Sequence, residues 1–311
     1  MLYQRVLITG ANGLLGQELV RQLGSFVHYD VLATARDDEP RFSGGSCGYI
    51  ALDITDGSSL SAIFQDFSPD VVINCAAMTE VDRCESDRDA CWRVNTEAVD
   101  NLARLCQAGG SRIVQISTDF IFDGLVGLYR EDDRPNPLSY YGRSKLAGEN
   151  AARGAGIDQW AIARTVLVYG AGRDLPRTNF VLWVINKLTA GERIKIVTDQ
   201  WRSPTYAPDL AHGVERIIRF RKHGVFHLSG RELFSIYDMA VMVAESFGLD
   251  PELIQPIDGS GLKQSAVRPR KTDFIILKAE TELGFNPRNF RASLADLDHR
   301  LEILAESGSE T

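Results

Sequence analysis

The sequence contains few cysteines, and none of them forms a pair with the spacing of a metal site. The five cysteines are Cys47, Cys75, Cys84, Cys91 and Cys106. They include no Cys-x-x-Cys pair, and the five histidines are scattered without partners at zinc-ligand spacing. We therefore expect no metal site. An odd cysteine count in a chain of this length is typical of a reduced protein, which predicts a cytoplasmic location.

The sequence also lacks a positive excess and a long apolar run. Lys and Arg number 34 against 42 Asp and Glu, a formal net charge of -8, so no global positive field would attract a nucleic acid. No apolar run approaches the ~18 residues that a membrane span needs. The first residues, MLYQRVLITG, have strand-like patterning instead of a signal peptide's. We expect binding to neither nucleic acid nor membrane.

Short β-rich runs alternate with helix-like segments over the first half of the chain. The runs cover residues 5–9, 31–35, 49–53, 71–77, 112–118 and 160–165. The segment between the fourth and fifth runs, residues 89–109, has the pattern of one long helix. Such alternation predicts βαβ units and an α/β fold with a Rossmann-type, doubly wound parallel sheet.

Proline and glycine breaks become more frequent after about residue 170. At ~150 residues per domain, 311 residues predict two domains or one large one. We expect an NAD(P)-binding Rossmann domain over residues 1–168 and a smaller substrate-binding α/β domain over 169–311. Strand and helix segments around 205–230 are expected to return to the sheet of the first domain.

A glycine-rich turn follows the first predicted strand. Gly10, Gly13 and Gly16 stand in the order G-A-N-G-L-L-G, directly before a helical pattern. Glycines in this context permit a tight turn and close approach of the backbone to a pyrophosphate, which the helix N-terminus attracts. The turn predicts a dinucleotide site. Asn12 would brace the loop or tolerate positive φ.

The second predicted strand ends at a residue that bears on the choice of cofactor. Arg36 follows this strand, and a guanidinium there pairs with the 2'-phosphate of NADPH. Asp37 and Asp38 come next and could bind the ribose of NADH, so NADPH is favoured and NADH remains an alternative. Asp53 and Ile54, after the third strand, are placed to meet the adenine.

A tyrosine and a lysine are spaced to share one helix face. Tyr141 and Lys145 are four residues apart, so both side chains point to the same side. A nearby ammonium would lower the pKa of the phenol and make Tyr141 a better proton donor. Tyr140 is the rival, but its partner at this spacing is the uncharged Ser144. The preceding predicted strand ends with Thr118 and Asp119, where a hydroxyl can orient a substrate carbonyl.

Taken together, these motifs resemble the extended short-chain dehydrogenase/reductases, and among them the dTDP-4-dehydrorhamnose reductase family. Further matching stretches are NCAAMTEVDRCES at 74–86, VNTEAV at 94–99, STDFIFDG at 117–124, PLSYYGRSKLAGE at 137–149, ARTVLVYG at 163–170, DQWRSPTYAPDLA at 199–211 and VRP at 267–269. The resemblance covers essentially the whole chain. STDFIFDG and DQWRSPT are its most specific parts.

The resemblance implies a set of site residues. The catalytic residues would be Thr118, Tyr141 and Lys145, with Asp119 beside the reacting hydroxyl. The cofactor residues would be Gly10, Asn12, Gly13, Leu14, Leu15, Gly16, Arg36, Asp53, Ile54, Cys75, Ala76, Ala77, Thr79, Asn95, Tyr141, Lys145 and Val166, with Asn95 also bracing the site. The substrate residues would be Val81, Asp82, Thr118, Asn179, Thr205 and Arg268, with Arg268 on the diphosphate.

The implied reaction is reduction by NADPH of the C4 ketone of a nucleotide-linked 6-deoxyhexose. Family members tend to carry Trp where this chain has Leu167, so the sugar stays open. Some members hold magnesium at a dimer contact; Glu18 matches one ligand position, but a full ligand set is not evident. A homodimer is also left open.

Three alternatives remain. A 4,6-dehydratase would carry Glu at the position of Phe120, and an NAD-recycling epimerase would carry an acid at the position of Arg36. The third is a non-catalytic NADP-binding subunit, because GVFHLSGRELFSIYDMAVMVAESFGL and SAVRPR resemble the regulatory β subunits of methionine adenosyltransferase. Such a subunit would have no need of Thr118, Tyr141 and Lys145 together.

Overall fold

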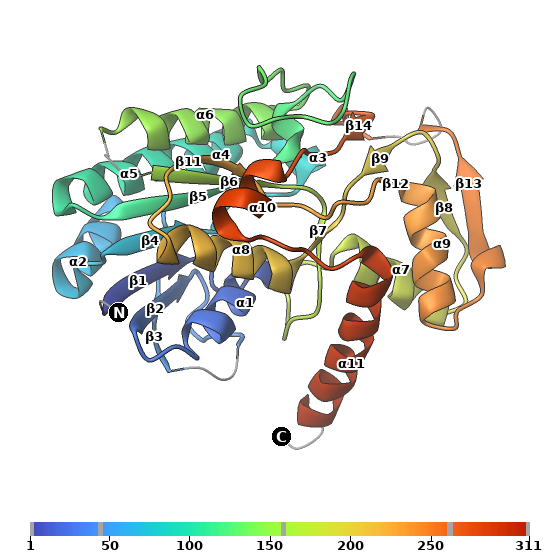
Figure 1. Ribbon diagram of the computed structural model, residues 1–311, viewed down its shortest axis with the longest axis horizontal. Coiled ribbons are helices and arrows are strands. Elements are labelled where there is room, and N and C mark those ends of the chain that lie inside the picture. The colour runs from blue at the N-terminus through green and yellow to red at the C-terminus, as the bar shows by residue number, and fades with distance from the viewer. Residues whose placement is uncertain (1–2, 43–45, 157–159, 260–263, 309–311) are drawn as a thin grey trace.

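Seven parallel strands form the central sheet of the larger lobe (Figure 1). The computed structural model describes residues 3–42, 46–156, 160–259 and 264–308. In spatial order the strands are β11 (Gly224–His227), β6 (Trp160–Thr165), β5 (Arg112–Thr118), β4 (Val71–Asn74), β1 (Gln4–Thr9), β2 (Tyr29–Ala35) and β3 (Cys47–Ala51). The predicted doubly wound parallel sheet is therefore confirmed.

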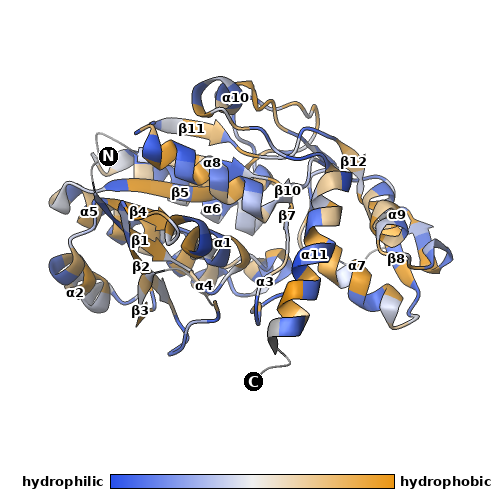
Figure 2. Ribbon diagram, turned by 60° about the horizontal axis from the view of Figure 1, so that its bottom comes forward, coloured by the Kyte–Doolittle hydropathy of each residue, from blue (hydrophilic) through white to orange (hydrophobic). Residues whose placement is uncertain are grey.

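Helices cover both faces of this sheet, which explains why its strands are apolar on both sides (Figure 2). One face packs against α1 (Leu14–Leu23), α8 (Ala207–Arg219) and α10 (Leu277–Leu283). The other packs against α2 (Gly57–Phe67) and α5 (Ala98–Gly109). Beside α5 lies α6 (Tyr140–Gly154).

The long helix predicted over residues 89–109 is helical throughout, but a π-helical turn interrupts its α-helical pattern. After α3 (Val81–Ser86), the chain forms α4 (Arg88–Trp92) and then the π-helical turn (Arg93–Glu97), which leads directly into α5. The buried side chain of Asn95 lies in this turn and bonds groups outside the helix. A π-turn re-aims a side chain in this way, and such turns are frequent at functional sites.

The smaller lobe has its own apolar core, which includes Val184, Met239 and Leu294. It contains the helices α7 (Phe180–Thr189), α9 (Ile236–Ser246) and α11 (Phe290–Gly308), and the paired strands β8 (Ile194–Val197) and β13 (Ile254–Ile257). Although they follow residue 169, α8, β11 and α10 pack in the larger lobe (Figure 1).

Short strands connect the two lobes near the carboxyl edge of the main sheet. They are β7 (Val168–Tyr169) with β10 (Thr205–Tyr206), and β9 (Trp201–Arg202) between β12 (Phe234–Ser235) and β14 (Lys271–Thr272). Two 3-10 turns span Asp119–Ile121 and Pro251–Leu253. None of the described helices is both long and apolar enough to cross a membrane.

Candidate active site

Four segments meet where the central strands end. The glycine turn follows β1, Cys75 to Ala77 follow β4, Thr118 ends β5, and Val166 follows β6. In an open parallel sheet this carboxyl edge is where ligands bind. The structure therefore brings together residues that are more than 150 positions apart in the sequence.

The glycine turn has the shape that close approach of a phosphate requires. Gly10 has φ 68°, and a Cβ there would lie 2.7 Å from the main-chain nitrogen of Ala76. A Cβ on Gly16 would lie 2.4 Å from the carbonyl oxygen of Gly10. No side chain caps α1, whose first turn holds no acidic residue. Its N-terminal amides at Leu14 and Leu15, both half-buried, fit a pyrophosphate.

The loop after β2 separates Arg36 from its acidic neighbour. The Asn12 amide donates to the Asp37 carboxylate at 2.8 Å, and Arg41 pairs with the other carboxylate oxygen at 3.0 Å. The Asn12 hydrogen bond holds the pKa of Asp37 below its usual value. Arg36 is exposed at the strand tip. The side chain of Asn12 thus braces this loop, and Asp37 is engaged while Arg36 faces solvent.

The other segments proposed for the cofactor lie around the same edge. The Asp53 carboxylate accepts from Thr55 in an exposed turn, while Ile54 is buried in the core beneath it. Neither side chain is therefore directed freely toward an adenine. Cys75, Ala76 and Ala77 are half-buried beside the glycine turn, and Thr79 is exposed.

Tyr141 is buried at the carboxyl edge, close to Thr118. Burial raises the pKa of Tyr141, and the neighbouring Thr118 hydroxyl lowers it by less. The net pKa lies well above the ordinary value for a phenol. The pKa of Tyr141 is therefore raised by burial, and not lowered as its spacing from Lys145 suggests. A phenol with a raised pKa stays protonated at neutral pH, the state in which it can donate a proton.

Lys145 lies on the same buried face of α6. Its ammonium donates to the carbonyl oxygen of Ile116 at 2.7 Å. Burial lowers its pKa to about 8, and the charge of Glu149 opposes this shift. Lys145 is thus a cation held at the edge of β5, with a pKa close to the working pH of most proteins.

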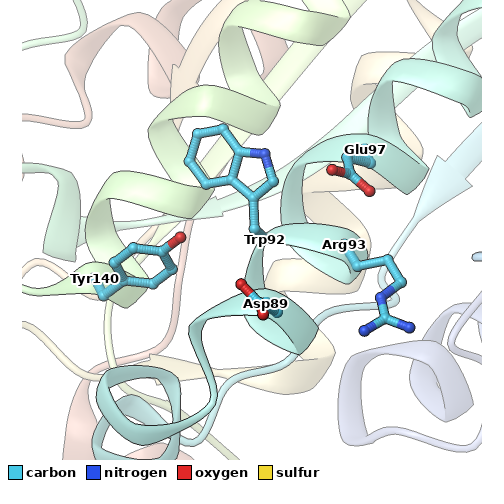
Figure 3. Close-up of a pocket in the computed structure, with 5 residues that line it drawn as sticks. All are labelled: Asp89, Trp92, Arg93, Glu97 and Tyr140. Atoms are coloured by element: carbon cyan, nitrogen blue, oxygen red, sulfur yellow. The ribbon is translucent and has the colours of Figure 1, made fainter.

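Tyr140 faces a different part of the molecule from Tyr141. It borders an open hollow of about 400 Å3 on the outer face of α4 and α6 (Figure 3). The hollow is lined by Asp89, Trp92, Arg93, Glu97 and Tyr140. The Arg88 guanidinium lies 5.1 Å from the centre of the Tyr140 ring. The geometry therefore favours Tyr141 over Tyr140 as the tyrosine of the site.

Asn95 connects the loop after β4 to α6. Its amide accepts from the Met78 N–H at 2.9 Å and donates to the Met78 carbonyl at 3.0 Å and to the Ser144 hydroxyl at 3.0 Å. All of these partners are protein groups. The side chain is fully buried, so its position fits bracing better than contact with a cofactor.

Two residues proposed for the substrate pair with each other across the lobes. Asp82, at the start of α3, forms an ion pair with Arg268 and also accepts from the Ala266 N–H at 3.0 Å. The Arg268 hydrogen bond lowers the pKa of Asp82 to about 2. Val81 is half-buried beside Asp82. A diphosphate bound by Arg268 would share this cation with Asp82.

Asn179 and Thr205 are engaged within the protein. The Asn179 side chain caps α7 and donates to the Gly170 carbonyl at 2.8 Å. The fully buried Thr205 hydroxyl donates to the Val166 carbonyl at 2.6 Å. The structure thus gives Thr205 the role of holding the loop after β6, where Leu167 has φ 38°, and does not direct its hydroxyl toward a substrate.

Comparison with known proteins identifies the family. Residues 4–303 match the family described as the RmlD substrate binding domain. The chain belongs to this family. It is 35% identical to the dTDP-4-dehydrorhamnose reductase of Mycobacterium tuberculosis over 303 residues, which covers 94% of this chain and 91% of that one. The prediction of this family is therefore confirmed.

Two further RmlD relatives bear on function. The methionine adenosyltransferase 2 subunit beta of Bos taurus is 31% identical over 299 residues, 94% of this chain and 86% of that one. The structure of the Bacillus anthracis dTDP-4-dehydrorhamnose reductase in complex with NADP superimposes with a TM-score of 0.83 at 28% identity. That match covers 96% of this chain and 100% of the other.

Glu18 is paired with arginines in this RmlD chain. One of its carboxylate oxygens accepts from Arg300 at 2.7 Å, and the other accepts from Arg21 at 2.8 Å. The described residues include no group of three or more His, Cys, Asp or Glu side chains arranged to hold a metal ion. Glu18 therefore connects α1 to α11 through Arg300.

Sequence reasoning missed several polar groups of this site. Arg177 donates to the Thr79 carbonyl at 2.7 Å and so connects the lobes. Arg202 and Thr272 contact Asp119 from β9 and β14. Arg177 lies outside the helices and strands, and the two strands have two residues each, too few to show periodicity. The buried Thr165 hydroxyl, paired in register beside Thr118, has no hydrogen-bond partner within the described chain, as a ligand-facing group would.

Proposed function

We propose that this protein is an NADPH-dependent oxidoreductase that reduces the C4 ketone of a nucleotide-linked 6-deoxyhexose, as in the formation of dTDP-L-rhamnose. The observation that carries this proposal is that Tyr141, Lys145 and Thr118 are all buried at the carboxyl edge, with Tyr141 and Lys145 on one face of α6 and Thr118 at the end of β5. A proton donor, an orienting hydroxyl and a cation are the groups that carbonyl reduction requires.

The class of enzyme and the cofactor are supported by the relatives. Two of those compared are named dTDP-4-dehydrorhamnose reductases, and one of these was solved with NADP. The glycine turn fits a dinucleotide. Because Gly10 has no side chain, the turn packs closely against Ala76 and keeps its backbone open to a phosphate. Arg36 at the tip of β2 favours the 2'-phosphate of NADPH, because Asp37 is engaged by Asn12 and Arg41.

Tyr141, Thr118 and Lys145 would each have a separate role in the carbonyl reduction. The reduced nicotinamide, when bound, supplies hydride to the carbonyl carbon. Tyr141, kept protonated by burial, donates its proton to the carbonyl oxygen. The Thr118 hydroxyl donates to Asp119 in this structure, and rotation of its hydrogen about the Cβ–Oγ bond would direct it to the carbonyl oxygen without moving the oxygen of Thr118. Lys145 supplies positive charge that stabilises the phenolate formed at Tyr141.

The diphosphate of the substrate would bind between the lobes. Arg268 pairs with Asp82 in the first turn of α3, and its planar guanidinium suits a diphosphate. Val81 and Asp82 border the same position. Leu167 stands where family members tend to carry Trp, so the sugar would have no aromatic ring to pack against at this position. The nucleotide sugar is the partner we expect; a homodimer and a cytoplasmic location stay predictions.

A second candidate is a regulatory subunit that binds NADP without turnover. The 31% identity to the methionine adenosyltransferase 2 subunit beta favours it, because that relative covers as much of this chain as the reductase from Mycobacterium tuberculosis does. Retention of Thr118, Tyr141 and Lys145 in one buried site argues for catalysis.

The test is NADPH oxidation with dTDP-4-keto-6-deoxyhexose supplied by the upstream enzymes. We expect rapid oxidation by the wild type. Tyr141→Phe should lower kcat by about 10²- to 10⁴-fold and leave NADPH affinity within about twofold. Tyr140→Phe is the matched control and should retain wild-type rates. An active Tyr141→Phe enzyme would refute the role of Tyr141, and tight NADPH binding without oxidation by the wild type would favour the regulatory candidate.

A further inference from the structure

Two residues of the connecting strands β9 and β14 contact the Asp119 carboxylate, which in turn bonds Thr118. The Thr118 hydroxyl donates to one oxygen of Asp119 at 3.0 Å. The other oxygen accepts a hydrogen bond from the Thr272 hydroxyl, and the Nε of Arg202 lies 3.7 Å from it. All four side chains are buried. Asp119 is thus held between the end of β5 and the paired strands β9 and β14.

Arg202 has little freedom to move. Its guanidinium donates to the carbonyl oxygens of Trp201, Pro269 and Arg270, and it lies 5.7 Å from the centre of the Phe120 ring. In the parallel pairing of β9 with β14, Arg202 and Thr272 are register partners, which places them side by side. Their positions are therefore fixed by the strand pairing.

The orientation of Asp119 determines that of Thr118. Water does not reach this carboxylate to replace a lost partner, because it is buried. Without the Thr272 hydroxyl, one oxygen would keep only the longer contact to Arg202, and the carboxylate could turn. Thr118 also accepts from the Phe120 N–H at 3.2 Å, so a turned threonine would release that amide as well.

We propose that Thr272 and Arg202 are positioning residues, which align Thr118 through Asp119 and so make the alignment of the catalytic edge depend on the paired strands β9 and β14. The role in turnover rests on the proposed function. The alignment of Thr118 by Asp119 does not depend on that function and can be measured without substrate.

The first test compares kinetics of Thr272 variants of the full chain. Thr272→Val removes the hydroxyl with little change of shape. We expect kcat for the 4-keto sugar to fall at least about tenfold, with NADPH affinity within about twofold. Thr272→Ser restores the hydroxyl and should recover most of the rate. Thr198→Val is the matched control, because the Thr198 hydroxyl bonds the Ile257 carbonyl instead of Asp119.

The second test measures hydrogen exchange of the Phe120 amide by NMR, without substrate. We expect faster exchange in Thr272→Val and in Arg202→Lys, and wild-type exchange in Thr198→Val. If Thr272→Val does not fold, kcat and the exchange of the Phe120 amide are measured in Arg202→Lys alone. Wild-type kcat and wild-type Phe120 exchange in the folded variants would overturn the proposal. If the wild type fails to oxidise NADPH, the proposed function fails, and the exchange measurement still decides the alignment.

Discussion

At the residue scale, burial decides the protonation of the catalytic pair. Spacing alone correctly places Tyr141 and Lys145 on one face of α6. The spacing suggests that the ammonium lowers the pKa of the phenol, but burial raises the pKa of Tyr141 and lowers that of Lys145 to about 8. Sequence reasoning could not give these directions, because the desolvation comes from strands and loops distant in the chain.

The shifted pKa of Lys145 predicts an alkaline limb in the rate profile. Burial disfavours the ammonium, so Lys145 is charged below about pH 8 and loses its proton above it. We expect kcat to fall about tenfold per pH unit above pH 8, since Tyr141 stays protonated there. Lys145→Arg keeps its charge and should lack this limb at a lower absolute rate. A wild-type profile that is flat to pH 10 would contradict this assignment.

The exposed Arg36 predicts cofactor preference. Arg36→Ala should raise the Kd for NADPH about 10- to 100-fold, because a charge-assisted bond to the 2'-phosphate is lost. The Kd for NADH should change less than about twofold, as measured by fluorescence titration. Arg104→Ala, on the exposed side of α5, is the control. Equal losses for both cofactors would show that Arg36 does not read the 2'-phosphate.

At the element scale, the strand, glycine turn and helix at the N-terminus depend on close backbone contact. Gly16→Ala would place a Cβ 2.4 Å from the Gly10 carbonyl oxygen, so the turn must shift. We expect a loss of about 1 to 3 kcal/mol in the free energy of unfolding and weaker NADPH binding, measured by urea denaturation and titration. Gly57→Ala, at the start of α2 with open space around it, should be neutral or slightly stabilising. An unchanged Gly16→Ala protein would contradict the role of this contact.

Elements with strong periodicity could be predicted from the sequence. The π-helical turn between α4 and α5 could not. The runs at 112–118 and 160–165 match β5 and β6 residue for residue. The predicted strand over 71–77 ends at Asn74, after which Cys75 to Ala77 leave the sheet at the edge of the site. The π-turn at Asn95 escaped prediction because its cause is tertiary: the amide bonds Met78 and Ser144 from other elements.

At the scale of the whole molecule, polar contacts between segments far apart in the sequence surround the site. Arg177 contacts Thr79, Arg268 pairs with Asp82, and Arg202 and Thr272 reach Asp119. Sequence motifs indicated Asp82, Asp119 and Arg268 individually through a family resemblance. They could not indicate that these residues pair across the lobes, because pairing depends on how the lobes pack.

The Asp82–Arg268 pair predicts opposite effects of two substitutions on substrate affinity. Arg268→Gln removes the cation and should raise KM for the nucleotide sugar at least about tenfold. Asp82→Asn frees the cation for the diphosphate, so KM should stay the same or fall. NADPH affinity should not change in either variant. An equal rise of KM in both would indicate that the pair binds substrate as a unit.

The most direct test of the account is isotope transfer. The wild type would be incubated with NADPH deuterated at nicotinamide C4, on the transferred face, and dTDP-4-keto-6-deoxyhexose, and the sugar product analysed by NMR and mass spectrometry. The account predicts one deuterium at C4 of the product, and none with Tyr141→Phe over the same time. A product without deuterium at C4, or no product while NADPH remains bound, would contradict the assignment as a 4-ketoreductase.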